Sequence, residues 1–139
     1  MIDRVLVPMD GSEMSEHALE FTLAAHPEAE ITVLHVVGGP SPHMAEATGL
    51  ALAEDLDVAA QEKAQPVFDT VAAITEEHDA DVDTLVALGL PARAIVERAG
   101  EYDLVVIGAH GRGLGARLLL GNVAETVTKR SPTPVTIVR

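Results

Sequence analysis

The chain has 139 residues, 47% of them hydrophobic, which favours a globular protein with one sizeable core and excludes a disordered chain. Its net charge is −13, from 22 acidic and 9 basic residues, which opposes binding to nucleic acid or an anionic membrane. The sequence contains no cysteine, no recognisable secretory leader and no apolar run long enough to span a membrane, so the chain is expected to be cytoplasmic. Its excess of acidic residues predicts a high-salt cytoplasm.

Apolar runs and helical spacing alternate along the first half of the chain. Residues 5–8 predict a short buried strand, and Ser12 is a natural N-cap for a helix that Pro27 ends. Residues 31–37 predict a second buried strand, which a glycine- and proline-rich break follows at 38–42.

The second half continues this alternation. Apolar residues keep a helical period from Leu52 to Ile74, and Pro66 within them is expected to kink or divide the helix. A further helix is expected to begin at Pro91 and to end near Ala99, with Gly100 as its C-terminal stop. Residues 123–130 predict the last helix. Three more strands are expected at 82–87, 104–107 and 135–138.

The resulting βαβαβαβαβ order predicts a doubly wound, mostly parallel sheet with helices on both faces. Ligands of such sheets bind beyond the carboxyl ends of the strands. Two motifs lie at such ends: Pro8-Met9-Asp10 after the first strand, and a glycine-rich loop at 108–121 after the fourth. In a flavodoxin-like strand order both would face one crevice.

The loop at 108–121 is longer than most strand-to-helix connections, which take about 2–6 residues. It is therefore either a phosphate cradle or a surface loop whose glycines only allow it to turn. Gly108 and Gly113 have the spacing of a P-loop, but Leu114 replaces the required lysine. The dinucleotide pattern also fails, because position 136, where its acid would fall, is Thr136.

At this point the sequence resembles the universal stress protein (UspA-like) family. The spacing Gly108-x2-Gly111-x9-Gly121 matches that family's ATP-binding signature. Residues 5–19, 34–36 and 131–135 are similar to its first strand and helix, its second strand and its last turn. The likeness covers nearly the whole chain, so residues 1–139 are expected to form a single universal stress protein domain.

The resemblance implies an adenine-nucleotide α-hydrolase-like, three-layer α/β fold with strand order 3-2-1-4-5, and ATP as ligand. Asp10 would contact the ribose or the adenine, with Pro8 and Met9 on the same side, and Val36 would meet the base through its backbone. The three glycines, Gly108, Gly111 and Gly121, would bring backbone amides close to the phosphates. A divalent ion, Mg²⁺ or Mn²⁺, would be held by the phosphates, because no set of carboxylates is available for it.

Asn122 departs from the family pattern, in which Ser or Thr usually follows the third glycine. Its amide can donate to a phosphate, and the alternative is that it only caps the last helix. Asp10 likewise has the alternative of local turn chemistry. His110 and Arg112 could donate to phosphate or offset its charge, as could Arg117, unless they are simply exposed to solvent.

Three hypotheses follow for the function. The first is a cytoplasmic stress-response module that binds ATP and changes its conformation or interactions with it. The second is a dimeric interaction module of the same fold without a nucleotide, and the third is an ATP-hydrolysing enzyme, which lacks an obvious general base. Residues 134–138 should form an edge strand, and the resemblance implies that two copies pair there as a homodimer.

Overall fold

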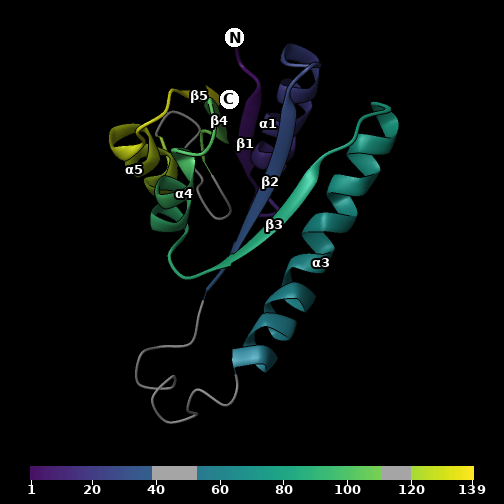
Figure 1. Cartoon of the computed structure of the whole chain (residues 1–139), viewed down its shortest axis with the longest axis vertical. Coiled ribbons are helices and arrows are strands. Elements are labelled where there is room, and N and C mark those ends of the chain that lie inside the picture. The colour runs from purple at the N-terminus through teal and green to yellow at the C-terminus, as the bar shows by residue number, and fades with distance from the viewer. Residues whose placement is uncertain (39–52, 111–119) are drawn as a thin grey trace.

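The computed structural model describes residues 1–38, 53–110 and 120–139. Strands and helices alternate along these residues (Figure 1). The elements are β1 (Arg4–Pro8), α1 (Glu13–Ala25), β2 (Glu30–Val37), α3 (Ala53–Glu77), β3 (Asp83–Leu88), α4 (Pro91–Ala99), β4 (Leu104–Gly108), α5 (Asn122–Arg130) and β5 (Val135–Val138).

The strands form one sheet in the order β3-β2-β1-β4-β5, and every neighbouring pair is parallel. This confirms the predicted order and the doubly wound fold. After β3, at one edge of the sheet, the chain crosses over to β4 on the other side of β1. The direction in which successive strands are added to the sheet therefore reverses at the central strand β1. A crevice for ligands is expected at this place, beyond the carboxyl ends of β1 and β4.

The two faces of the sheet carry separate apolar cores. Val5, Val7 and Val33 pack with α1 and α3 on one face. Leu6, Leu34 and their neighbours pack with α4 and α5 on the other face, so that the fold has three layers (Figure 1). Because successive side chains of a strand point to opposite faces, a strand buried on both faces is apolar throughout, as residues 5–7 are.

Helix α1 begins as the sequence predicts. Ser12 is its N-cap, and its Oγ accepts a hydrogen bond from the backbone N–H of Ser15 at 3.2 Å. Gly11, just before the cap, has a φ of 85°, which glycine adopts without strain. The turn from β1 into α1 is therefore fixed by local sequence.

Two helical features refine the prediction. Helix α3 runs through Pro66 as one element rather than dividing there. Thr70 Oγ1 donates to the Pro66 carbonyl at 3.2 Å, inside the continuous helix. Gly100 does end α4, but with φ −64° and ψ −16° it is a right-handed C-cap rather than a left-handed residue beyond it.

The amino ends of β1 and β4 are joined by polar contacts. Asp103 accepts hydrogen bonds from the backbone N–H groups of Asp3 and Arg4, both at 3.0 Å. These two bonds lower the pKa of the Asp103 carboxyl, and the bond from Arg4 has the larger effect. The Arg4 guanidinium also lies 5.0 Å from the centre of the Tyr102 ring.

Candidate functional site

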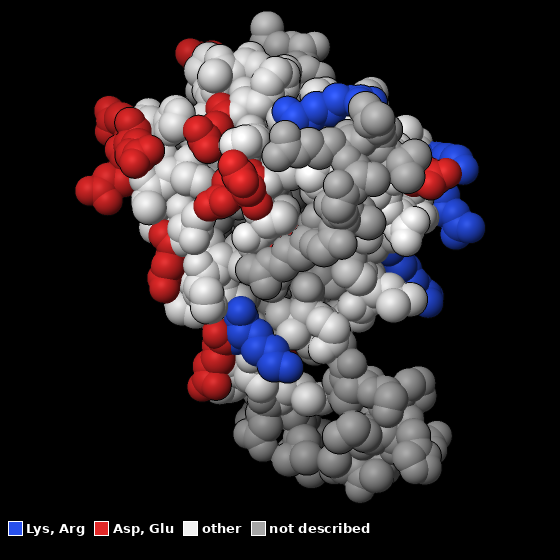
Figure 2. Space-filling view, turned by 180° about the vertical axis from the view of Figure 1, so that it is seen from behind, with Lys and Arg blue, Asp and Glu red and all other residues white. Residues whose placement is uncertain are grey.

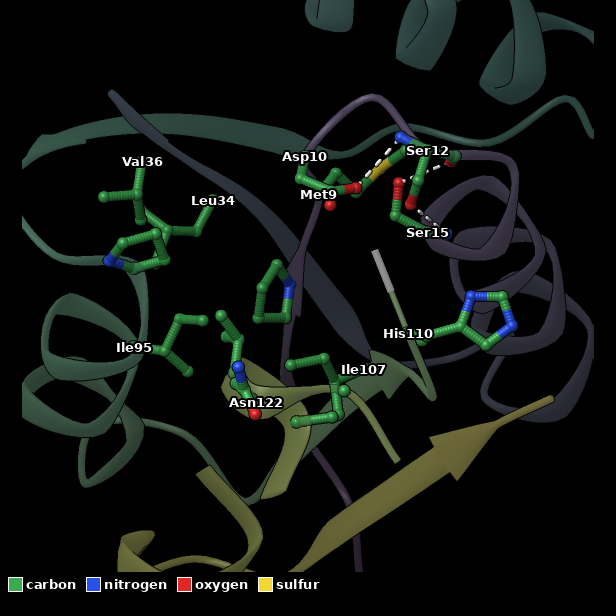
Figure 3. A pocket seen from close by; sticks show the side chains of 16 residues that line it. Met9, Asp10, Ser12, Ser15, Leu34, Val36, Ile95, Ile107, His110 and Asn122 are labelled. Carbon is green, nitrogen blue, oxygen red and sulfur yellow. Dashed lines mark hydrogen bonds between the residues drawn. The ribbon is translucent and has the colours of Figure 1, made fainter. Parts of the chain in front are cut away.

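A pocket of about 370 Å³ lies beyond the carboxyl ends of β1, β2 and β4. Its volume is within the range of small-molecule sites. The amino ends of α1, α4 and α5 surround it, so three helices begin at its wall. Its lining residues are Pro8, Met9, Asp10, Ser12, Ser15, Leu34, Val36, Pro91, Ile95, Ile107, Gly108, His110, Gly121, Asn122, Val123 and Ala124 (Figure 3).

The pocket brings together every predicted site residue that the structure describes: Pro8, Met9, Asp10, Val36, Gly108, His110, Gly121 and Asn122. Gly111 and Arg112, the remaining two, lie outside the described residues, as does Arg117. The two motifs that follow the first and fourth strands therefore do face one crevice.

One part of the pocket wall is apolar. In Figure 3 the side chains of Leu34, Val36 and Ile95 lie together, across the pocket from Ser12 and Ser15. Ile107 adds to this wall from β4. Such a surface suits the flat face of a base or another apolar ring.

The backbone of Val36 adds a polar edge to this apolar wall. Leu34 O accepts a bond from the Met9 N–H on the β1 side of β2, whereas Val37 O accepts one from Gly89 on the β3 side. Backbone groups of successive residues in a parallel strand point to alternate sides, so the N–H and C=O of Val36 point to the β1 side. There the pairing of β1 ends at Pro8, opposite Leu34, and Val36 lies beyond it.

The other part of the wall is polar and comes from the turn between β1 and α1. Asp10 is exposed, and its Oδ1 accepts the backbone N–H of Ser12 at 2.9 Å. Ser15 Oγ donates to the Ser12 carbonyl at 2.7 Å. The alternative interpretation of Asp10 as turn chemistry is therefore correct for one carboxylate oxygen, while the residue also lines the pocket.

Helix α5 begins one residue earlier than predicted, and this changes the interpretation of Asn122. Gly121 is the N-cap and makes no side-chain cap bond, while Asn122 is the first helical residue. Asn122 is therefore not the cap. Its side chain is exposed, and Figure 3 places it across the pocket from Asp10.

The start of α5 also shows which amides face the pocket. The N–H of Gly121 donates to the Ala109 carbonyl at 2.7 Å, so this amide already has a partner within the protein. The first bond within the helix joins Glu125 N–H to Gly121 O. The N–H groups of the residues between them, 122–124, have no partner within the helix, and all three residues line the pocket. N–H groups at the start of a helix, where the helix dipole is positive, favour a nearby anion.

Gly108 has a packing reason to be glycine, in addition to the expected approach of its backbone to phosphate. A Cβ atom at this position would lie 2.9 Å from Met14 Cγ and 3.0 Å from both the backbone carbon and oxygen of Met14. Gly108 thus lets α1 approach β4 closely. Its role in the structure is packing, and the adjacent residue Ala109 supplies the carbonyl that anchors Gly121.

As far as the described residues go, positive potential in the pocket comes from backbone N–H groups rather than from cationic side chains. Among the described residues, no Lys or Arg lines it, and its titratable side chains are Asp10 and His110. Figure 3 shows the His110 ring turned toward α1 and away from Val36 and Ile95. Over residues 1–38, 53–110 and 120–139, no group of His, Asp and Glu is arranged to hold a metal ion.

Acidic side chains gather on the flank formed by α3, at the left in Figure 2. On α3 and the turn after it, the exposed acids are Asp57, Glu62, Asp69, Glu76, Glu77, Asp79 and Asp81. This flank lies on the opposite face of the sheet from α4 and α5. Within the described residues, an anion at the pocket is favoured by the local helix termini.

Sequence reasoning missed several lining residues. Pro91 and Ile95 belong to α4, whose start follows the carboxyl end of β3. The same rule that singled out the other strand ends could have found them. The apolar contribution of Leu34 and Ile107 carried no separate signal, because both residues read as core strand positions.

The comparisons with known proteins agree with this fold. The family model described as the universal stress protein family matches residues 1–139. The chain belongs to this family. Universal stress protein MJ0531 of Methanocaldococcus jannaschii is 33% identical, over 98% of this chain and 81% of that protein. Universal stress protein YxiE of Bacillus subtilis is 28% identical over the full length of both.

Solved structures with the same fold include the two that follow. The structure of hypothetical protein MJ0577 superposes with a TM-score of 0.79 at 27% identity, covering 99% of this chain and 96% of that one. A universal stress protein in complex with cAMP superposes with a TM-score of 0.69 at 26% identity, covering 99% and 97%. Among the described parts of this chain, none of the helices has the length and apolar character needed to span a membrane.

Proposed function

We propose that this universal stress protein binds an adenine nucleotide, ATP in the first instance, in the pocket between β1, β2 and β4. The observation that carries the proposal is that one pocket joins an apolar wall, an acidic turn and a helix start whose N-cap, Gly121, makes no side-chain cap bond. These three parts match a base, a ribose and a phosphate chain in their chemistry. The related protein in complex with cAMP, which contains adenine, supports the same ligand class.

Each part has a physical role in this proposal. The N–H and C=O of Val36 offer the donor and acceptor that the N1 and N6 edge of adenine requires. Asp10 accepts hydrogen bonds from the vicinal hydroxyls of ribose. The amides at the start of α5 donate to phosphate oxygens, and the Asn122 side chain adds one further donor in place of the usual hydroxyl. Mg²⁺ or Mn²⁺, when bound, would be held by the phosphate oxygens.

We expect nucleotide binding to act through conformation or interactions rather than through hydrolysis. Apart from His110, the described lining residues supply no evident general base for hydrolysis. We further infer that residues 1–139 act as one module in a cytoplasm of high salt, given the net charge of −13. A homodimer through β5 is part of the proposal, since the sheet order leaves this strand at an edge. Sedimentation at working salt tests it, and a monomer contradicts it.

Calorimetry with ATP and Mg²⁺, at low salt and at molar KCl, tests nucleotide binding. Asp10→Ala should weaken binding about 10-fold or more, because it removes charged hydrogen bonds to the ribose. Asp81→Ala is the matched control, since Asp81 is an exposed acid outside the pocket, and it should leave the affinity within about twofold. The absence of saturable binding by the unchanged protein at both salt concentrations refutes the proposal.

The second candidate is a dimeric interaction module of the same fold that binds no nucleotide. The replacement of the usual Ser or Thr by Asn122 and the strongly negative charge favour it. The two candidates differ in what the purified protein carries. Adenine nucleotide released on denaturation supports the first, whereas its absence in repeated preparations, with no binding in calorimetry, supports the second.

A further inference from the structure

His35 is a histidine of β2 that the pocket does not use. It lies between Leu34 and Val36, whose side chains face α4 and α5, so its own side chain is on the opposite face of the sheet. It is half-buried, and its Nδ1 lies 2.7 Å from the Met9 carbonyl oxygen. Because a carbonyl oxygen only accepts, Nδ1 carries the proton and donates it.

This bond completes a double anchor on Met9. The Met9 N–H donates to the Leu34 carbonyl at 2.8 Å, and the Met9 carbonyl accepts from His35. Met9 is also 97% buried, its side chain packed in the core beneath α1. Both backbone groups of this residue are therefore held by β2, although β1 itself has ended at Pro8.

The anchor sets the direction of the next residue. The Met9 carbonyl and the Asp10 N–H belong to one trans peptide unit and point in opposite directions. When His35 holds the carbonyl, it fixes the plane of this unit and with it the point from which the Asp10 side chain leaves the backbone. The bond from Ser12 N–H to Asp10 Oδ1 then orients the carboxylate within the pocket.

We propose that His35 is a positioning residue for the nucleoside end of the site, acting through the Met9 carbonyl to hold Asp10 toward the ribose. This inference rests on the proposed function. It assigns a role in binding to a side chain on the far face of the sheet, outside the pocket lining. His35 does so as a donor from Nδ1, so the size of its ring is not what matters.

Three substitutions separate this role from a general loss of packing. His35→Asn places an amide donor near the position of Nδ1, His35→Gln places it near Nε2, and His35→Leu removes it. Calorimetry with ATP should give an affinity within about twofold of the unchanged protein for His35→Asn, and about 3- to 10-fold weaker for the other two. The readout is thus rescue by the correctly placed donor.

His78 provides a matched control. Its Nδ1 also donates to a backbone carbonyl, that of Ile74, at 2.9 Å. It follows the end of α3, near the amino end of β3 and away from the pocket. His78→Leu should lower thermal stability without changing nucleotide affinity by more than about twofold.

The outcomes are distinct. Equal affinity for His35→Leu and the unchanged protein overturns the role of His35, as does equally weak binding by His35→Asn and His35→Leu. If His35→Leu does not fold, the comparison of His35→Asn with His35→Gln decides in the same way. A protein that binds no ATP overturns the proposed function itself. In that case ¹⁵N spectra still test the role of His35. They show whether His35 holds its proton on Nδ1, and whether the Asp10 amide signal moves in His35→Gln but not in His35→Asn.

Discussion

Replacing Gly108 with alanine tests whether this glycine serves packing or ligand approach. The added Cβ would lie 2.9–3.0 Å from three atoms of Met14, two of them backbone. Ordinary carbon contacts are about 3.5–4.0 Å, so the overlap is about 0.5–1 Å. The Met14 side chain can turn away, but its backbone can only move if α1 shifts. Ala18 and Leu19 of α1 are fully buried, so such a shift disturbs the core.

The expected cost of Gly108→Ala is about 1–3 kcal/mol, the usual range for overpacking. An unfolding entropy of about 2.1 cal/mol/K per residue gives about 0.3 kcal/mol/K for 139 residues. The melting temperature should therefore fall by about 3–10 °C. Circular dichroism during heating and in urea, without nucleotide, measures the change.

Gly100→Ala is the control for this experiment. Its Cβ would meet only Pro132 Cγ, at 3.8 Å, and the residue has a right-handed helical backbone that alanine adopts freely. It should leave stability unchanged or raise it by up to about 1 kcal/mol. If Gly108→Ala melts at the temperature of the unchanged protein but loses nucleotide binding, the packing argument is wrong and the glycine serves the ligand.

Three further substitutions have expected outcomes. In urea unfolding, Ser12→Ala should lower the free energy of unfolding by about 1 kcal/mol, because Ser12 caps α1. Asn122→Ala should change it by no more than about 0.5 kcal/mol, because Asn122 is not a cap. An equal loss in both variants would show that Asn122 does cap α5. Asp103 has a lowered pKa in the folded protein, so its contribution to stability is present above its ordinary pKa and is lost as the pH falls through the folded value. The difference in unfolding free energy between the unchanged protein and Asp103→Asn should therefore be constant near neutral pH and shrink below about pH 4, and a difference that persists in acid contradicts the assigned cause.

The strands and most helix ends could be predicted because their signals are local. A fully buried parallel strand is an apolar run, and Ser12 and Pro91 mark helix starts by their own chemistry. The strand order itself followed from the family resemblance. The carboxyl-end rule then located the pocket before any contact was known.

What the sequence did not reveal depends on contacts between distant segments. The need for glycine at 108 arises from Met14 on another element. The engaged amide of Gly121 depends on Ala109, across a loop, and the first residue of α5 was misplaced by one position. His35 lies within an apolar strand, and the partner of its hydrogen bond, Met9, could not be predicted from the strand pattern.

The pocket wall is assembled from five separate stretches of chain, between Pro8 and Ala124. No fragment that lacks one of them can present the complete wall, so a ligand of this pocket binds only the fully folded chain. Such a ligand adds about 2.7 kcal/mol to the free energy of unfolding at a concentration 100 times its Kd. The concentration of that ligand in the cell would then govern how long the protein survives proteolysis. The lifetime of the protein would therefore rise and fall with the ligand concentration.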